Sequence, residues 1–198
     1  MLIFLLATAV WQPAPAHAAK NILVFGDSLS AGYGIDREKS WVNLLQQQLL
    51  RTGAKYHIVN ASISGETTLG GRERIASALQ QYRPAIVILE LGANDGLRGY
   101  SISSVEANMT ALIENIQKAN AQIVLVGMKL PPNYGEPYIT QFHNLYPRLA
   151  KKYRLSLLPF LLEGVKPDQF QADNLHPNEA AQPQLMRNVL KALQPLLR

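Results

Sequence analysis

The sequence predicts an α/β fold in which a parallel β-sheet is covered by helices on both faces. Short apolar runs of strand length alternate with segments whose apolar residues recur at helical spacing. The apolar run at residues 85–91 is typical of a central parallel strand, buried on both sides. Because strands and helices alternate with no linker-like stretch between them, we expect one domain built on one sheet.

In the first half of the chain, strands are expected at residues 21–26, 56–60 and 85–91. Between the first two strands, apolar residues recur at helical spacing over residues 41–50, and Gly53 ends this helix. A glycine-rich turn at residues 64–71 leads into a second helix that runs to about Tyr82. Pro84 then breaks the helical pattern and starts the third strand.

In the second half, strands are expected at residues 123–127 and 155–158, with helices at about 139–153 and 178–197. An earlier helix, capped by Ser103 or Ser104, carries one apolar stripe: Val105, Met109, Leu112, Ile113 and Ile116. Pro183 fits the first turn of the last helix. The prediction is therefore a five-stranded sheet.

Composition narrows the functional classes. The 198 residues fit a single domain, and the hydrophobic fraction of 47% with 17% charged residues is that of a globular protein. The absence of cysteine excludes disulfides, a thiol nucleophile and thiolate metal sites. The net charge of +5 is not clustered, so no nucleic-acid partner is expected. No His/Asp/Glu spacing typical of a metal site occurs, and we expect no cofactor.

The N-terminal residues 1–19 predict a cleaved export signal rather than part of the fold. An apolar run is followed by prolines and an A-x-A pattern that ends at Ala18, so cleavage is expected after Ala18 or Ala19. The run is too short to anchor the chain in a bilayer. The first cation is Lys20, so the usual positive start is missing. The alternative is an extra strand or a lipid-associated tail. Residues 20–198 form the expected domain, periplasmic or secreted.

Polar turns follow several of the predicted strands. They contain Gly26-Asp27-Ser28, residues 60–65, Gly92-Ala93-Asn94-Asp95 and residues 129–131. The loops at the carboxyl ends of strands in an open parallel sheet converge on one crevice. These turns therefore predict one shared site.

The expected nucleophile is Ser28, at the tip of the first strand. Near the other end of the chain, Asp173-Asn174-Leu175-His176 offers a base, His176, and a carboxylate that orients it, Asp173. The alternatives are a serine that only caps a helix and an ordinary Asn-Pro turn with surface charges. Asp27 is predicted to be structural because neighbours on the chain tend to point apart. Asp95 is predicted to anchor its loop.

Acyl transfer also needs hydrogen-bond donors for the developing oxyanion. The candidates are the side-chain amide of Asn94 and the backbone N–H groups of Gly65 and Ser28. The local alternatives are an Asx-turn at Asn94 and a positive φ at Gly65.

An acyl pocket is expected along the loops after the third and fourth strands. The segment Gly96-Leu97-Arg98-Gly99-Tyr100 places two glycines around a bulky pair, which suits a loop that shifts as the acyl chain enters. Leu97, Leu130, Pro131 and Tyr134 are the expected apolar wall. Packing of a surface loop is the alternative role for the last three.

These blocks resemble the GDSL, or SGNH, hydrolases. The resemblance rests on Gly26-Asp27-Ser28-Leu29, Gly65, Gly92-x-Asn94-Asp95 and Asp173-x-x-His176. It is closer still to the bacterial periplasmic thioesterase I, lysophospholipase and arylesterase group, over residues 21–197. The resemblance implies a flavodoxin-like three-layer α/β/α sandwich, a Ser28–His176–Asp173 triad, and an oxyanion hole of Ser28, Gly65 and Asn94. It implies no metal or organic cofactor.

The expected activity is hydrolysis of carboxylic esters and thioesters through an acyl-enzyme on Ser28, by a monomer acting on small-molecule or lipid substrates. Two alternatives stay open: a carbohydrate O-acetyl esterase on the same fold, and a non-catalytic periplasmic binding module. Neither a G-x-G-x-x-G nor a G-x-S-x-G motif follows a predicted strand, which argues against nucleotide binding and an α/β-hydrolase elbow.

Overall fold

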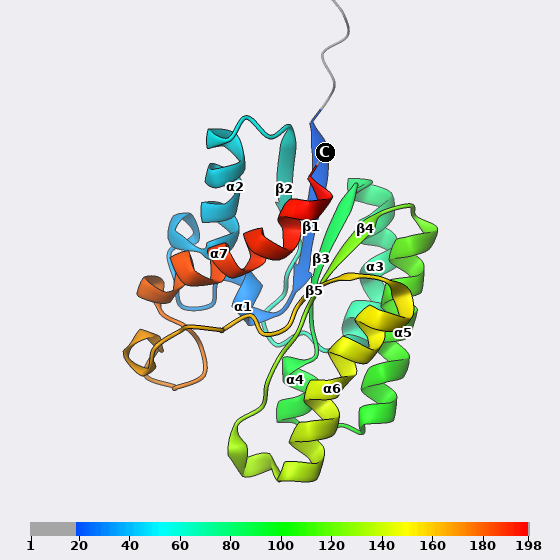
Figure 1. Ribbon diagram of the computed structural model, residues 1–198, viewed down its shortest axis with the longest axis vertical. Coiled ribbons are helices and arrows are strands. Elements are labelled where there is room, and N and C mark those ends of the chain that lie inside the picture. The colour runs from blue at the N-terminus through cyan, green and yellow to red at the C-terminus, as the bar shows by residue number, and fades with distance from the viewer. Residues whose placement is uncertain (1–18, 198) are drawn as a thin grey trace, which may run out of the picture.

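The structure is a computed structural model that describes residues 19–197, and it contains the predicted five-stranded parallel sheet (Figure 1). The strand order is β2-β1-β3-β4-β5. The strands are β1 (Lys20–Gly26), β2 (Tyr56–Asn60), β3 (Ile86–Glu90), β4 (Gln122–Val126) and β5 (Ser156–Leu158). The expected fold class is confirmed. The expected leader, residues 1–19, lies almost entirely outside the described residues.

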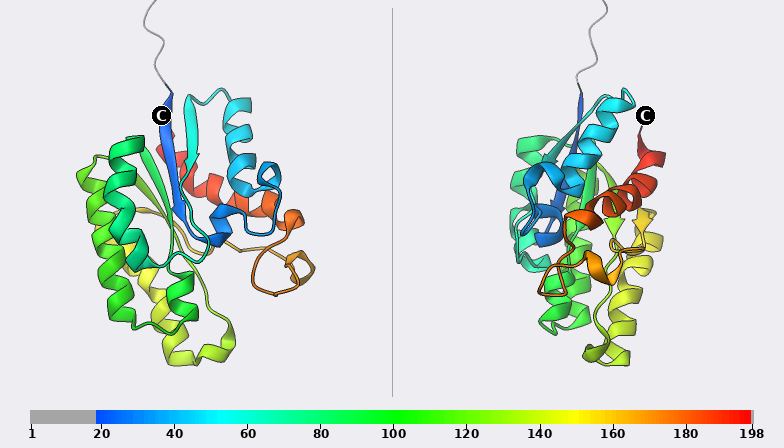
Figure 2. Two further views of the ribbon diagram at one scale, coloured as in Figure 1. Left: turned by 180° about the vertical axis from the view of Figure 1, so that it is seen from behind. Right: turned by 90° about the vertical axis from the view of Figure 1, so that its left-hand side faces the viewer.

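Helices cover both faces of the sheet (Figures 1 and 2). On one face lie α2 (Trp41–Arg51) and α7 (Gln182–Leu193); on the other lie α3 (Thr68–Tyr82), α5 (Ile102–Lys118) and α6 (Glu136–Tyr153). From β1 the chain adds β2 on one side of the sheet, and then β3, β4 and β5 in succession on the other side. Because crossovers between parallel strands are right-handed, this reversal places the helices on opposite faces.

The central strands are buried on both sides, which explains their continuous apolar sequence. Ile22, Leu23, Val24 and Phe25 of β1 are inaccessible to solvent, and all of β3, including Glu90, is buried. The reversal in strand order lies between β1 and β3, which pair directly. In open α/β sheets, the crevice at such a reversal is where ligands bind.

Short elements complete the chain. They are α1 (Ser28–Ala31), α4 (Ala93–Leu97) and five short 3₁₀ segments: Arg37–Lys39, Pro132–Tyr134, Pro167–Gln169, Glu179–Ala181 and Gln194–Leu196. The short helices α1 and α4 lie where the sequence predicted polar turns, so these two turns are in fact single helical turns. None of the helices described is long and apolar enough to cross a membrane.

Two predicted helix boundaries are wrong. The helix expected to begin after Ser103 or Ser104 is capped by Ser101, whose Oγ accepts the N–H of Ser104 at 3.3 Å. This places Ser104 at the third helical position, which is the usual donor to a capping side chain. The final helix is not continuous over 178–197. Its α-helical part ends at Leu193, since Pro195 lacks the N–H that a helix interior requires.

Candidate active site

Ser28 lies at the carboxyl end of β1, as the first residue of α1. Asp27 caps this helix: its Oδ1 accepts the N–H of Leu29 at 3.0 Å. The Asp27 side chain therefore turns into the protein while that of Ser28 is only partly buried. The sequence prediction that these neighbours point apart agrees with this geometry.

The three residues predicted to form a triad lie in a line. His176 Nε2 is 2.9 Å from Ser28 Oγ, and His176 Nδ1 is 2.7 Å from Asp173 Oδ2. The second contact fixes the tautomer in which Nδ1 carries the proton and Nε2 is free to accept one from Ser28. Ser28 and His176 are 148 residues apart in the chain, so only the fold brings them together.

The Asp173 carboxylate also organises its own loop. Its Oδ1 accepts the backbone N–H groups of Leu175 and His176, both at 2.9 Å. These hydrogen bonds lower the pKa of Asp173 to about 2. The backbone N–H of His176 contributes most, followed by the His176 ring and the N–H of Leu175. Asp173 is therefore charged over the whole neutral and mildly acidic range, as an orienting group for His176 must be.

Two of the three predicted oxyanion donors, Ser28 and Asn94, line one cavity together with His176. Gly65 has φ +78°, a left-handed conformation that favours glycine. Among the described residues, the N–H groups of Ser28 and Gly65 have no acceptor. Asn94 Nδ2 donates to Asp27 Oδ2 at 3.1 Å, which leaves its second amide proton for another acceptor. Together, these donors have the chemistry of an oxyanion hole.

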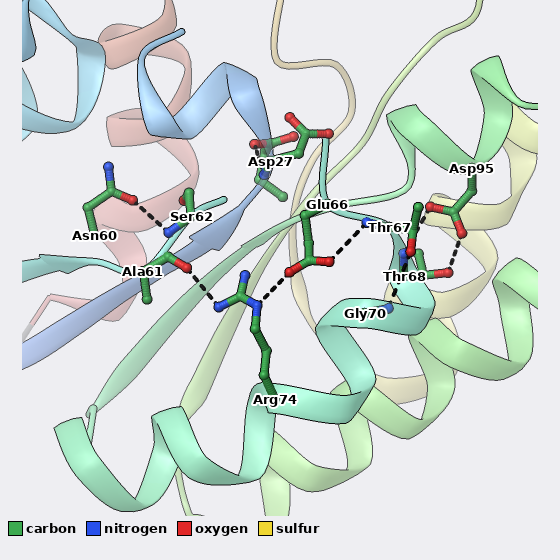
Figure 3. Close-up of polar contacts among 11 residues, drawn as sticks. Asp27, Asn60, Ala61, Ser62, Glu66, Thr67, Thr68, Gly70, Arg74 and Asp95 are labelled. Atoms are coloured by element: carbon green, nitrogen blue, oxygen red, sulfur yellow. Dashed lines mark hydrogen bonds and ion pairs between the residues drawn. The ribbon is translucent and has the colours of Figure 1, made fainter. Parts of the chain in front are cut away.

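A polar cluster holds the loop that carries Gly65 (Figure 3). Arg74 of α3 donates to Glu66 Oε2 at 2.6 Å and to the carbonyl of Ala61 at 2.8 Å. The Arg74 guanidinium also lies 3.9 Å from the centre of the Phe25 ring. The loop is thus tied on both sides of Gly65 to a partly buried cation that packs against the core. Sequence analysis did not single out Arg74 or Glu66.

Asp95, which was predicted to anchor its own loop, binds the first residue of the neighbouring helix α3. Its carboxylate accepts the Thr68 hydroxyl at 2.5 Å and the Thr68 backbone N–H at 2.9 Å (Figure 3). Asp95 belongs to α4 and Thr68 begins α3, so this buried pair connects the Asn94 and Gly65 loops. The relative positions of these two donors are therefore fixed inside the protein.

Beneath the nucleophile lies a buried carboxyl group that the sequence prediction missed. Glu90 Oε2 accepts the Ser30 hydroxyl at 2.5 Å and the backbone N–H of Asp27 at 3.3 Å. A side chain at Gly26 would collide with this carboxyl, because its Cβ would lie 2.5 Å from Glu90 Oε2. The only sequence clue was an acidic residue in an otherwise apolar strand.

Burial changes the protonation of both carboxyls under α1. The pKa of Asp27 is raised to about 6, and burial is the largest cause. The N–H of Leu29, the charge of His176 and the Asn94 amide act in the opposite direction and lower this pKa. Burial, and then the charge of Asp27, raise the pKa of Glu90 well above its ordinary value. The buried site therefore favours the neutral form of each carboxyl more than water does.

A cavity of about 90 Å³ opens beside Ser28 and His176. Three of the expected wall residues line it: Leu97, Leu130 and Pro131. Tyr134 is not among the described residues that line it. Its hydroxyl instead donates to the backbone carbonyl of Leu97 at 3.0 Å, so it supports the wall from behind. Lys129, from the predicted polar turn at residues 129–131, also lines the cavity. The prediction did not assign Met128, Phe160, Leu162 or Leu175 to the wall, because they come from loops that only the fold brings together.

Within residues 19–197, no group of three His, Cys, Asp or Glu side chains is placed to hold a metal ion. The chemistry of the site is carried by its own serine, histidine and carboxylate. The arrangement defines a hydrolase with a serine nucleophile.

Comparison with known proteins identifies the family. The GDSL-like Lipase/Acylhydrolase family matches residues 24–182, so the chain belongs to that family. It is 45% identical over 182 residues to the Esterase TesA of Pseudomonas aeruginosa, covering 91% of this chain and 90% of that protein. It is 42% identical over 184 residues to the Thioesterase 1/protease 1/lysophospholipase L1 of Escherichia coli, covering 92% and 87%.

Solved structures show the same fold. A crystal structure of TesA has a TM-score of 0.88 and 44% identity, covering 90% of this chain and all of that one (100%). A psychrotrophic esterase EstA from Pseudoalteromonas has a TM-score of 0.86 and 39% identity, covering 90% and 98%. The expected family and the expected class of enzyme, a hydrolase acting on ester bonds, are confirmed.

Proposed function

We propose that the protein hydrolyses carboxylic esters and thioesters through an acyl-enzyme on Ser28. The observation that carries this mechanism is the unbroken contact from Ser28 Oγ through the His176 ring to Asp173, beside a cavity with an apolar wall. The family and the named relatives support the reaction class.

In the first half-reaction, Ser28 Oγ bonds to the substrate carbonyl carbon while its proton passes to His176 Nε2. Asp173, held ionised, stabilises the imidazolium that forms. The negative charge on the carbonyl oxygen is met by the N–H groups of Ser28 and Gly65 and by the Asn94 amide. Collapse of this intermediate breaks the bond to the leaving alcohol or thiol, which takes the proton from His176.

Water completes the cycle. His176 Nε2 takes a proton from water as the oxygen attacks the acyl carbon of the Ser28 ester. A second oxyanion forms in the same hole. When it collapses, the carboxylic acid leaves and Ser28 Oγ recovers the proton from His176. No cofactor enters either half-reaction.

The substrate class follows from the cavity wall. Leu97, Leu130, Phe160 and Leu162 present an apolar surface beside Ser28, which favours an acyl chain or aryl group over an acetyl group on a sugar. The relatives include an arylesterase of Vibrio mimicus at 42% identity, which supports this class. Lipid and small-molecule esters and thioesters are therefore the proposed substrates.

Export to the periplasm and a monomeric state are part of the same proposal. Export is supported by the sequence of residues 1–19, which carries an apolar run and an A-x-A pattern. The mass of the N-terminal peptide of the protein recovered from a periplasmic fraction would test it, since an uncleaved leader would contradict export by this route.

The test of the activity is hydrolysis of a p-nitrophenyl ester series from acetate to palmitate. We expect activity that peaks beyond acetate and falls by at least about 10³-fold in Ser28→Ala. Ser103→Ala, which removes an exposed hydroxyl far from the site, is the matched control and should keep full activity. Equal activity in the wild type and Ser28→Ala would contradict the mechanism, and a maximum at acetate would favour the carbohydrate esterase.

A further inference from the structure

Tyr33 lies against the ring of His176 on the side of the nucleophile. The two ring centres are 4.7 Å apart and the planes are tilted by 41°. Tyr33 follows α1 in sequence, so the element that carries Ser28 also delivers this aromatic ring to His176. The residue is 52% exposed, so the contact with His176 lies at the surface of the protein.

Gln171 holds the backbone of Tyr33 in place. Its Nε2 donates to the carbonyl of Tyr33 at 2.8 Å and to the carbonyl of Pro177 at 3.2 Å. Its backbone N–H donates to the carbonyl of His176 at 2.8 Å. One residue thus connects the loop after Ser28 to the backbone of His176 and Pro177, across 138 positions of sequence.

The loop that carries the histidine is closed at its base. Phe170 and Pro177 form an isolated antiparallel bridge, and Asn178 N donates to the carbonyl of Gln169 at 2.8 Å. Beyond that base, the residues from Ala172 to Leu175 are exposed. The Tyr33 ring and the Gln171 amide join this loop to the nucleophile side, together with the Ser28–His176 hydrogen bond.

We propose that Tyr33, fixed by Gln171, is a positioning residue that keeps His176 aligned with Ser28 and stabilises its charged form during acyl transfer. This role rests on the proposed acyl-enzyme mechanism, in which His176 becomes an imidazolium in both half-reactions. A cation is attracted to the face of an aromatic ring within about 6 Å, whereas a neutral imidazole gains much less. The contact therefore stabilises the transition state more than the ground state.

Other groups also face His176, and they define the background for this effect. Asp173 contacts Nδ1 from the same loop, Ser28 contacts Nε2, and the charge of Asp27 reaches the ring from the turn before α1. A substitution at Tyr33 replaces none of these groups. The comparison of Tyr33→Leu with Tyr33→Phe, which keeps the ring, therefore isolates the aromatic contact.

The test compares Tyr33→Leu with Tyr33→Phe by steady-state hydrolysis of p-nitrophenyl butyrate over a range of pH. For Tyr33→Leu we expect kcat to fall about two- to fivefold with KM unchanged. The acid limb of kcat/KM should move to lower pH by about half a unit, since the imidazolium loses a stabilising contact. Tyr33→Phe keeps the ring and should restore both properties.

Gln171→Met provides the second test, since it removes the amide without adding charge. It should reproduce part of the Tyr33→Leu effect, and the double variant should lose less than the product of the two single losses. Tyr82→Leu, at the end of α3 beside the amino end of β1, is the control for removal of a tyrosine.

The outcomes separate this role from the mechanism on which it rests. An acid limb that stays in place in Tyr33→Leu, or a rise in KM without a fall in kcat, would overturn the role while Ser28→Ala still abolished hydrolysis. Hydrolysis that survived Ser28→Ala would instead overturn the mechanism. A simple loss of folding would appear as a lower melting temperature and a smaller active fraction, with the acid limb unmoved, and it would also count against the role.

Discussion

Asp27 and Asp173 lie on the two sides of the same active site, yet their surroundings are opposite. Asp27 is inaccessible to solvent at the end of the central strand β1, and burial raises its pKa to about 6. Asp173 is exposed on the loop before α7, and hydrogen bonds from His176 and Leu175 lower its pKa to about 2. The fold thus places one carboxylate where its charge is costly and the other where its charge is favoured.

This difference shows how the two parts of the site are held. The nucleophile side is built into the core: Asp27, Glu90 and Ser30 are buried together, and Asp95 connects the Asn94 and Gly65 loops. The histidine side is held by local hydrogen bonds within an exposed loop. Substitutions on the histidine side should therefore reduce activity with little loss of stability, whereas those on the nucleophile side should affect stability as well.

The largest expected effect is that of Asp173→Asn. The asparagine Oδ1 keeps the acceptor for the Leu175 and His176 N–H groups, so the loop should stay folded. Its amide cannot hold the tautomer of His176 that accepts the proton of Ser28, nor stabilise the imidazolium. We expect kcat/KM to fall by about 10³- to 10⁴-fold. The melting temperature should fall only slightly, because the charge that the hydrogen bonds stabilise is exposed to solvent.

The control for this variant is Asp168→Asn, which neutralises another exposed carboxylate in the same region. It should retain wild-type kinetics. If Asp173→Asn lost several degrees in melting temperature together with its activity, the histidine loop would be part of the stable core, and the contrast between the two sides would be wrong.

Asn94→Ala, on the nucleophile side, should cause the next largest loss of activity. It removes one oxyanion donor, and we expect kcat to fall by about 10²- to 10³-fold with little change in KM. It also removes the amide that donates to Asp27 Oδ2, so the charged Asp27 loses a partner in a buried place. Unlike Asp173→Asn, this variant should therefore lose stability as well, measured by urea unfolding at pH 7.

The control is Asn115→Ala on α5, whose amide only donates to the carbonyl of Ala111 in its own helix. It should keep wild-type kcat and nearly wild-type stability. A fall in kcat of less than about fivefold in Asn94→Ala would mean that the backbone donors of Ser28 and Gly65 suffice.

The sequence predicted those parts of the molecule that follow from local pattern. The apolar run of β3 and the alternation of strands and helices were enough for the five-stranded sheet. Asn94 was predicted to lie beside Ser28 because polar residues after parallel strands converge on one crevice, and the two residues line the same cavity. The boundary of α5 was missed because Ser101, Ser103 and Ser104 are equally good caps, and only packing decides among them.

The parts that were missed depend on contacts between distant segments. In the sequence, Glu90 is only an acidic residue in an apolar strand. Its contacts with Gly26 and Ser30 become evident only in the folded protein. Arg74 lies in a helix with several other charged residues, and its contact with Phe25 comes from packing alone. Tyr134 has the right chemistry for the acyl pocket but lies behind Leu97, and this depth cannot be read from sequence.

Asp27→Asn gives the smallest expected effect, and its sign tests the contrast most directly. In the folded protein Asp27 holds its proton up to a pH of about 6, whereas the unfolded chain releases it near the ordinary value of 3.8. The folded state therefore binds more protons between these values, and the wild type loses stability relative to Asp27→Asn as the pH rises through this window. The difference should reach about 3 kcal/mol at most by pH 7.

Urea unfolding of both proteins at several pH values between 4 and 7 measures this difference. Asp36→Asn is a matched control. Like Asp27, Asp36 caps a short helix, and its side chain accepts the backbone N–H of Glu38, but Asp36 lies at the surface. The free-energy difference between the wild type and Asp36→Asn should lack the rise expected for Asp27. If Asp27→Asn instead became relatively less stable with rising pH, charged Asp27 would be stabilised by its hydrogen bonds more than it is penalised by burial. The nucleophile side would then resemble the Asp173 side in its electrostatics.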